Sequence, residues 1–183
     1  MKKEITASGA FRLLAPRPVC LLTTSYKGQV NVMTFGWSSA VSQEPPLIML
    51  AIHPSRYTHG MLERSEECVL NIPARPLAEQ VWTCGTRSGE DVDKLELAGL
   101  TTESAQDIDT PWIDECLAHI ECAIVDLFTP GDHSLFIAQV VSAWVEEEAF
   151  DGVWRGPDNE ELLPLQHLGG KTFALMGEKI TLS

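Results

Sequence analysis

The fold of this chain is decided by residues 31–39, NVMTFGWSS, in which small polar side chains alternate with large apolar ones. Such alternation is typical of a β-strand whose two faces meet different surroundings. A similar apolar and hydroxyl-rich run, VCLLTTS, precedes it at residues 19–25. The segment between the two runs is YKGQ, and its Gly28 can adopt the positive φ of a tight turn. The sequence therefore predicts a β-hairpin with strands at residues 19–25 and 30–37.

The rest of the chain continues the same pattern. Four further apolar runs predict strands at residues 47–52, 67–72, 118–128 and 133–147. Three segments with helical spacing predict short helices at residues 57–64, 77–84 and 92–97. The sequence TPGD at residues 129–132 joins the last two strands and indicates a tight hairpin turn. Hairpin-connected strands with few helices predict one mainly β domain over residues 1–183, a split antiparallel barrel of the Greek-key type.

Charge and composition limit the classes of partner. The chain has 13 Lys and Arg against 26 Asp and Glu, a formal net charge of −13, and 44% hydrophobic residues. Nucleic acid and anionic membrane are poor partners, because both require clustered basic side chains. No apolar window is long enough to span a membrane and no signal-peptide core follows the first lysines, so we expect a cytoplasmic protein. The acidic residues 101–109 predict a solvated surface excursion.

The five cysteines do not suggest a metal site or a disulfide framework. Their number is odd, and no two show the close spacing of zinc ligands. Cys20, Cys68 and Cys122 each lie in an apolar, strand-like run. We expect these three to be buried, inert thiols, since free cysteine is among the most buried residue types.

A second informative motif is HPSRYT at residues 53–58, one strand after the first. Ser55 is a candidate N-cap, followed by the free backbone N–H groups of a helix start, and Arg56 adds a guanidinium that suits a phosphate. The simpler alternative is a capped surface helix with a solvated arginine. Together with residues 31–39, the motif favours a planar, partly polar ligand with an anionic tail, as in flavin mononucleotide (FMN).

Several short motifs in a fixed order carry a resemblance to a known family. They are Arg17-Pro18-Val19, Asn31-Val32-Met33-Thr34, Ser38-Ser39, Pro45-Pro46-Leu47, Arg56-Tyr57-Thr58, Asn71-Ile72-Pro73, Ser88-Gly89 with Asp93-Lys94, Gly131-Asp132-His133 and Leu168-Gly169-Gly170. With this set, nearly the whole chain resembles the flavin reductase-like family of FMN-binding split barrels. The resemblance implies an FMN-bearing homodimer with flavin pockets near the subunit interface.

The resemblance also assigns candidate cofactor residues. Those expected to line the flavin ring are Asn31, Val32, Met33, Thr34, Ser38 and Ser39, with Trp37 as a wall. Those expected at the phosphate are His53, Ser55, Arg56, Tyr57 and Thr58. Ser88, Gly89 and Lys94 are expected to close over the phosphate or the ribityl chain. The alternative for Lys94 is an ion pair with Glu90 at helical spacing.

His133 is the candidate catalytic residue. In reductase members of the family, a histidine in this motif is associated with the nicotinamide pocket beside the flavin. The alternative is a hairpin-end histidine that only hydrogen-bonds the turn. Hydride transfer to the flavin is chemistry of the cofactors themselves, so the protein has to orient them and exclude water.

The resulting expectation is an NAD(P)H:flavin oxidoreductase, with the choice between NADH and NADPH open. A flavoredoxin-like FMN carrier that passes electrons to a protein partner is the second interpretation, and a non-catalytic flavin-binding module is the third. A monooxygenase or another redox protein would be the partner. The acidic surface favours a carrier, since redox partners are often matched by charge.

Overall fold

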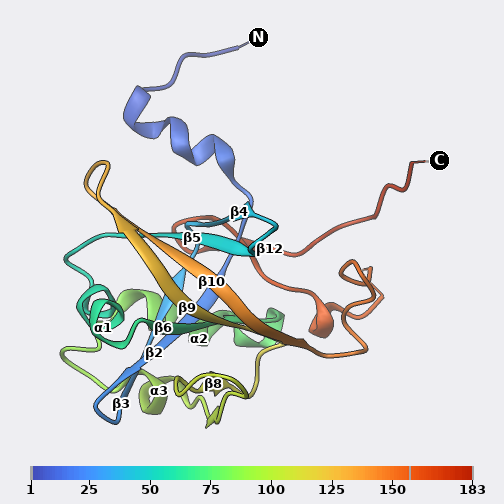
Figure 1. The fold of residues 1–183 in the computed structure, drawn as a ribbon. Helices are drawn as coiled ribbons and strands as arrows, with labels where there is room; N and C mark the ends of the chain where they lie inside the picture. Colours follow the sequence, from blue (N-terminus) through green and yellow to red (C-terminus); the bar gives the residue numbers. More distant parts are fainter. Residues whose placement is uncertain (1, 157, 183) are drawn as a thin grey trace.

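The structure is a computed structural model that describes residues 2–156 and 158–182 (Figure 1). The strands are β1 (Arg17–Pro18), β2 (Cys20–Tyr26), β3 (Gln29–Phe35), β4 (Ser38–Ser42), β5 (Leu47–Ile52), β6 (Glu67–Ile72), β7 (Thr102–Glu103), β8 (Trp112–Ile113), β9 (Ala118–Phe128), β10 (Ser134–Val145), β11 (Gln166–Gly169) and β12 (Thr172–Ala174). The α-helices are α1 (Tyr57–Ser65), α2 (Ala78–Thr86) and α3 (Lys94–Ala98). Short 3-10 helices are η1 (Ala7–Leu14), η2 (Arg75–Leu77) and η3 (Glu160–Leu162).

One seven-stranded antiparallel sheet, in the order β3-β2-β6-β9-β10-β5-β4, forms the body of the molecule. The edge strands β3 and β4 do not pair with each other, yet only Gly36 and Trp37 separate them along the chain. A two-residue link keeps the two edges close at that point, because each residue spans at most about 3.6 Å. The sheet is therefore a barrel that is closed covalently at one end and split along its side, which confirms the predicted mainly β split barrel.

The sequence prediction of a single strand over residues 30–37 was wrong at its end. The chain leaves β3 after Phe35 and starts β4 on the opposite edge of the sheet at Ser38. No proline or turn dipeptide marks this change, so the apolar alternation runs through it without a signal. The predicted hairpin of β9 and β10 is confirmed, and in Figure 1 the pair crosses the front of the barrel.

The core lies on both faces of β2. Leu22 and Phe136 belong to one cluster inside the barrel, whereas Leu21 and Val32 pack with Val81 of α2 on the other side. The prediction of buried, free thiols at Cys20, Cys68 and Cys122 is confirmed, and Cys84 and Cys116 are also free and buried. Burial raises the pKa of Cys20 to about 12, so this thiol stays protonated at neutral pH.

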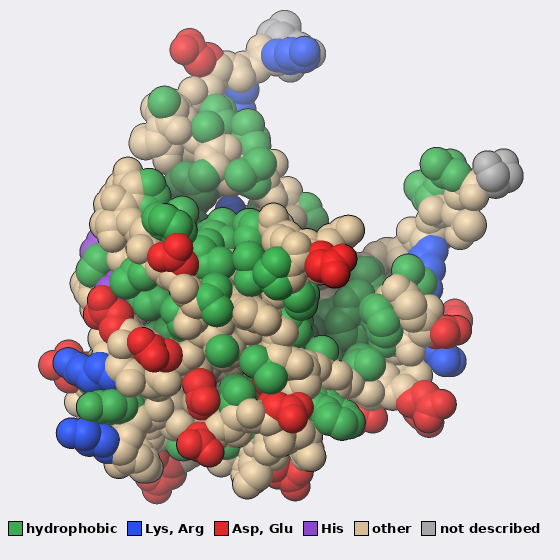
Figure 2. All heavy atoms as spheres, viewed as in Figure 1, with side chains coloured by type: hydrophobic (Ala, Val, Ile, Leu, Met, Phe, Trp, Pro, Cys, Tyr) green, Lys and Arg blue, Asp and Glu red, His purple; other side chains and the backbone are tan. Residues whose placement is uncertain are grey.

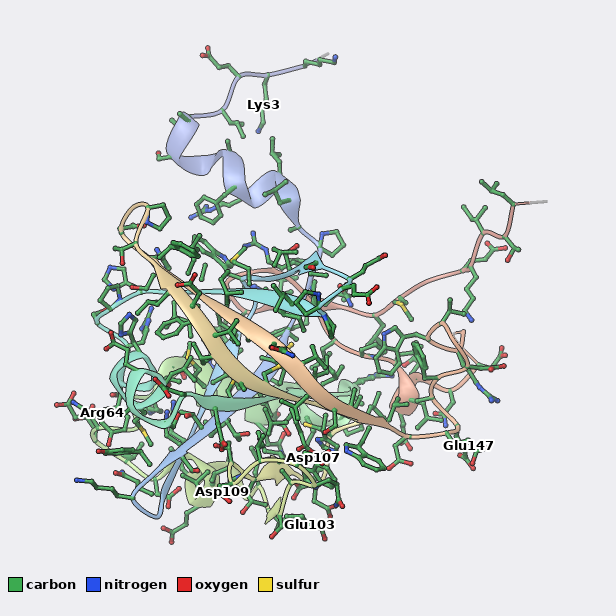
Figure 3. The ribbon with its side chains drawn as sticks, in the orientation of Figure 1. Lys3, Arg64, Glu103, Asp107, Asp109 and Glu147 are labelled. Carbon is green, nitrogen blue, oxygen red and sulfur yellow. The ribbon has the colours of Figure 1, made fainter. Side chains whose placement is uncertain are left out.

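The acidic segment after α3 is more ordered than the predicted solvated excursion. Figure 3 shows Glu103, Asp107 and Asp109 gathered near β8, at the edge of the molecule. The fully buried carboxylate of Glu121 accepts hydrogen bonds from the backbone N–H groups of Gln106 and Asp107, at 3.0 and 2.8 Å. The carboxylate of Glu67 accepts from the N–H of Asp109 at 3.1 Å. Acidic side chains from β6 and β9 therefore tie this loop to the sheet, a contact that its composition did not indicate.

Both ends of the described chain leave the body of the molecule (Figure 1). The 3-10 helix η1 has no buried residue, and its Leu13 and Leu14 are 72% and 75% exposed. No helix among residues 2–156 and 158–182 is long and apolar enough to cross a membrane.

Candidate functional site

A cleft of about 690 Å³ opens at the covalently closed end of the barrel, where β3 and β5 end and β10 begins. Its volume falls in the range of small-molecule sites. Eleven of the predicted site residues line it, namely Met33, Thr34, Trp37, His53, Ser55, Arg56, Tyr57, Thr58, Ser88, Gly89 and His133. A smaller adjoining pocket of about 500 Å³ is lined by Asn31, Val32, Gly89 and Lys94.

Two predicted residues lie in neither pocket. Ser38 and Ser39 belong to β4, where they pair with Leu50 and Met49 of β5. Neither serine lines the cleft of a single chain, because the chain crosses to the other sheet edge after Trp37, and their ring-lining role stays a prediction. Sequence reasoning also missed several cleft residues, namely Trp82, Thr86, His167, Gly170 and Phe173. The last three come from a tail whose only signal was the Leu168-Gly169-Gly170 motif.

One end of the cleft is suited to an anion. The N–H groups of Tyr57 and Thr58, at the start of α1, have no acceptor among the described residues. Together with the helix dipole, such groups attract negative charge. Arg56 and Arg87 line the same cleft, so two cationic side chains belong to it. This end therefore combines the charge and the donors that a phosphate needs.

Ser55 does not cap this helix, contrary to the sequence prediction. Arg56 occupies the N-cap position, without a side-chain cap hydrogen bond. The hydroxyl of Ser55 lies 2.8 Å from Nδ1 of His53, and the backbone N–H of Ser55 donates to the same nitrogen at 3.1 Å. Because Nδ1 of His53 accepts, its ring proton is on Nε2 in the neutral form. The uncapped turn leaves its donors available to a ligand.

Asn31 lies between the cleft and the adjoining pocket and links the elements that line them. Its Nδ2 donates to the hydroxyl of Thr58 at 2.7 Å, which joins β3 to the first turn of α1. Gly89 packs so closely on Asn31 that an added Cβ would lie 2.0 Å from Asn31 Oδ1. Only glycine fits this position, so the Ser88-Gly89 segment is needed for its backbone path as well as for contact with a ligand.

Lys94 is a buried cation, 5% exposed, in the adjoining pocket. Its Nζ donates to the backbone carbonyl of Cys84 at 3.3 Å. Burial, with a smaller contribution from the charge of Arg56, lowers the pKa of Lys94 to about 8. The alternative ion pair with Glu90 was wrong, because α3 begins at Lys94 itself and Glu90 lies outside it. A lysine buried without a carboxylate partner costs stability, and such groups are often found where a ligand supplies the missing charge.

The other end of the cleft is aromatic. The rings of Trp37 and His133 are stacked, with centroids 4.6 Å apart and planes inclined by 26°. His53 meets His133 edge to face at 5.2 Å, and Phe11 of η1 meets Trp37 at 5.7 Å. The carboxylate of Asp132 accepts from Nδ1–H of His133 at 2.8 Å, and this bond lowers the pKa of Asp132. Nε2 of neutral His133 is then an acceptor, whereas Nε2 of His53 is a donor.

Known proteins share this architecture. The profile of the Flavin reductase like domain matches residues 12–173, so the chain belongs to that family. An uncharacterized protein of Pyrococcus abyssi is 33% identical over 170 residues, which cover 93% of this chain and 96% of that protein.

Two solved structures extend the likeness. A flavoredoxin of Methanosarcina acetivorans is 26% identical with a TM-score of 0.85, covering 100% of this chain and 95% of its own. The FMN-binding domain of a flavin reductase-like enzyme of Shewanella baltica is 25% identical with a TM-score of 0.82, covering 98% and 96%.

The buried charge of Lys94 leads to a prediction about the protein without ligand. Lys94→Met should increase the free energy of unfolding at pH 7, by on the order of 1–2 kcal/mol, because no ammonium then has to be desolvated. The folded-state pKa of Lys94 near 8 lies below the ordinary lysine pKa of 10.5, so the unfolded chain binds the additional proton between these values. The stability contribution of Lys94 should therefore rise as the pH increases from 8 to 10.5.

Urea denaturation of the ligand-free protein at pH 7 and pH 10 measures both effects. Lys179→Met, at an exposed lysine of the tail, is the matched control and should change neither value. A loss of stability in Lys94→Met at pH 7 would show that the lysine is already well compensated inside the protein.

Proposed function

We propose that the chain binds FMN and reduces it with a hydride from NADH or NADPH. The observation that carries the proposal is the polarity of the cleft, which is cationic and rich in free N–H donors at one end and aromatic at the other. FMN has the same polarity, with one phosphate and one planar ring system. Its isoalloxazine supplies the hydride-accepting chemistry when bound.

The residues present fit this group. The N–H groups of Tyr57 and Thr58 and the guanidinium of Arg56 would hold the phosphate. Met33, Thr34 and Trp37 line the part of the cleft that is left for the ring. The hydroxyl of Thr34 donates to the carbonyl of Val81, so Thr34 contributes its methyl group and backbone to that wall. A single phosphate site favours FMN over FAD, which would require a second anion site.

The aromatic end supports a nicotinamide as the second ligand. Its carboxamide has one acceptor and one donor group, and the neutral rings of His53 and His133 provide one Nε2 donor and one Nε2 acceptor. Trp37 is 39% exposed, so a planar molecule can reach this end from solvent. In this proposal His133 orients the nicotinamide, and no side chain has to transfer the hydride.

An FMN electron carrier is the second candidate function. It is supported by the likeness to a flavoredoxin and by the acidic surface, which would suit a positively charged redox protein. A carrier would hold FMN in the same way, but it would exchange electrons with a protein instead of NAD(P)H. The two functions therefore share the FMN site and differ in the molecule with which the flavin exchanges electrons.

A homodimer is part of the proposal. Figure 2 shows hydrophobic side chains gathered over the front of the sheet, where β9 and β10 lie, with acidic side chains around them. The exposed apolar residues on these strands and on β4 are Val41, Val125, Leu127, Phe128, Val141, Trp144 and Val145, here called the outer apolar patch. Exposed apolar side chains gathered on neighbouring strands are typical of an interface, and the projecting arm η1 adds further uncovered apolar side chains.

The phosphate site predicts a difference between two flavins. Arg56→Ala should weaken FMN binding by about 10-fold to 100-fold, since a charge-assisted hydrogen bond contributes roughly 1.5–3 kcal/mol. Riboflavin has no phosphate, so its affinity should stay unchanged. Fluorescence titration with both flavins tests this, with Arg64→Ala at the other end of α1 as control. Equal loss of both affinities would place the phosphate away from Arg56.

The donor is tested by anaerobic reduction of the FMN-loaded protein. In His133→Ala, reduction by NADH or NADPH should slow by about tenfold or more, because hydride transfer depends steeply on donor placement. FMN binding and reduction by dithionite should stay at the wild-type level. A wild-type protein that neither nicotinamide reduces would refute the reductase and leave the carrier. A mutant as fast as wild type would leave His133 as a hairpin-end residue only.

The dimer is tested at the outer apolar patch. Wild type should sediment as a dimer at micromolar concentration, whereas Val141→Asp should sediment as a monomer because a carboxylate would be buried in the interface. Val153→Asp introduces the same charge at a valine outside the patch and should remain dimeric. A folded wild-type monomer would contradict this part of the proposal.

A further inference from the structure

Three polar side chains behind the cleft lie in a row, with His59 between Ser134 and Glu63. His59 lies in the first turns of α1 and is 7% exposed. Its Nε2 lies 2.9 Å from the hydroxyl of Ser134, which is 3% exposed, and its Nδ1 lies 3.3 Å from the carboxylate of Glu63. The ring also meets Phe136 edge to face, with centroids 5.0 Å apart. Glu63 thus fixes the ring of His59 from one side while β10 holds it from the other.

Serine, histidine and a carboxylate in this order are also the groups of a hydrolase triad. A hydrolase needs a substrate carbonyl within reach of the serine. Ser134 is buried and lines neither pocket, so no substrate reaches its hydroxyl. The group therefore acts within the protein and not as a nucleophilic centre.

Its position connects the two ends of the cleft. His59 directly follows Thr58, whose N–H belongs to the anion-binding end, and Ser134 directly follows His133 of the aromatic end. Among the described residues, the hydrogen bond and the aromatic contact that join side chains of α1 and β10 both use the ring of His59. The loop before Ser134 is polar and exposed from Thr129 to Asp132 and offers no apolar packing of its own.

We infer that His59 is a positioning residue that couples the phosphate-binding turn of α1 to the hairpin tip that carries His133. The inference rests on the proposed function for the identity of the phosphate ligand, FMN. A phosphate on the N–H groups of Tyr57 and Thr58 restricts the motion of the first turn of α1. The buried hydrogen bond from His59 to Ser134 then restricts the motion of the start of β10 as well. His133 is thereby set at a defined distance from the flavin.

The experiment compares the amide hydrogen exchange of residues 129–135 with and without FMN. Wild type should exchange at least several-fold more slowly at the hairpin tip once FMN is bound. Ser134→Ala should bind FMN within about threefold of wild type, since no group that touches the phosphate is changed, but should lose most of the FMN-dependent protection. Glu63→Ala, at a 46% exposed side chain, frees Nδ1 of His59 and should reduce the protection in the same direction.

Ser65→Ala is the matched control. Its hydroxyl ties the other end of α1 to Thr24 of β2 at 2.7 Å, away from β10. It should keep the FMN-dependent protection at the wild-type level. If Ser134→Ala fails to fold, Glu63→Ala decides by the same measurement.

A second readout is the rate of flavin reduction. In Ser134→Ala, reduction by NADH or NADPH should fall by about tenfold while reduction by dithionite is unchanged, as expected when one partner of a hydride transfer is misplaced. Full protection of the tip in both Ser134→Ala and Glu63→Ala would overturn the inference. Absence of NAD(P)H-dependent reduction in wild type would instead refute the proposed reductase, and the exchange measurement would still decide the coupling.

Discussion

The short link between β3 and β4 is the constraint on which the rest of the structure depends. Gly36 and Trp37 carry the chain from one edge of a seven-stranded sheet to the other, so the sheet has to curl until its edges meet there. The ends of β3 and β5 and the start of β10 then surround the same opening. Trp37 is placed at the rim by the link itself, where it stacks on His133. The same two-residue link thus closes the barrel and forms the rim of the cleft.

The electrostatics of the cleft oppose those of the whole chain. A protein with a net charge of −13 repels anions at long range, yet Arg56 and Arg87 line the cleft and Lys94 lines the adjoining pocket. Burial of the Lys94 charge costs stability in the ligand-free protein, because within residues 2–156 and 158–182 its hydrogen-bond partner is a carbonyl and no carboxylate pairs with it. An anionic ligand would offset this cost. Because binding of an anion removes this unfavourable term, it increases the affinity for a phosphate-bearing cofactor.

Much of the fold could be predicted from the sequence, because the strands of the barrel carry continuous or alternating apolar runs and the hairpins carry turn residues. The helix start next to Arg56 was predictable as well, since the two are adjacent in the chain, and its phosphate role stays a prediction. The crossing to β4 was not, because Gly36 separates two apolar runs without a turn signal. The position of Ser38 and Ser39 on the opposite sheet edge therefore could not be predicted. The burial of Lys94 and Glu121 could not be predicted, because it depends on segments far away in sequence.

The two ends of the cleft differ in how firmly they are held, and this difference bears on the choice between reductase and carrier. The anion end is fixed by the buried bond from Asn31 to Thr58 and by Gly89 packed against Asn31. The aromatic end consists of half-exposed rings from four separate segments, including the projecting arm η1. A carrier needs only the first property. An exposed, adjustable aromatic end facing solvent is what a second planar ligand requires in order to enter and leave while the flavin stays bound, and this asymmetry favours the reductase.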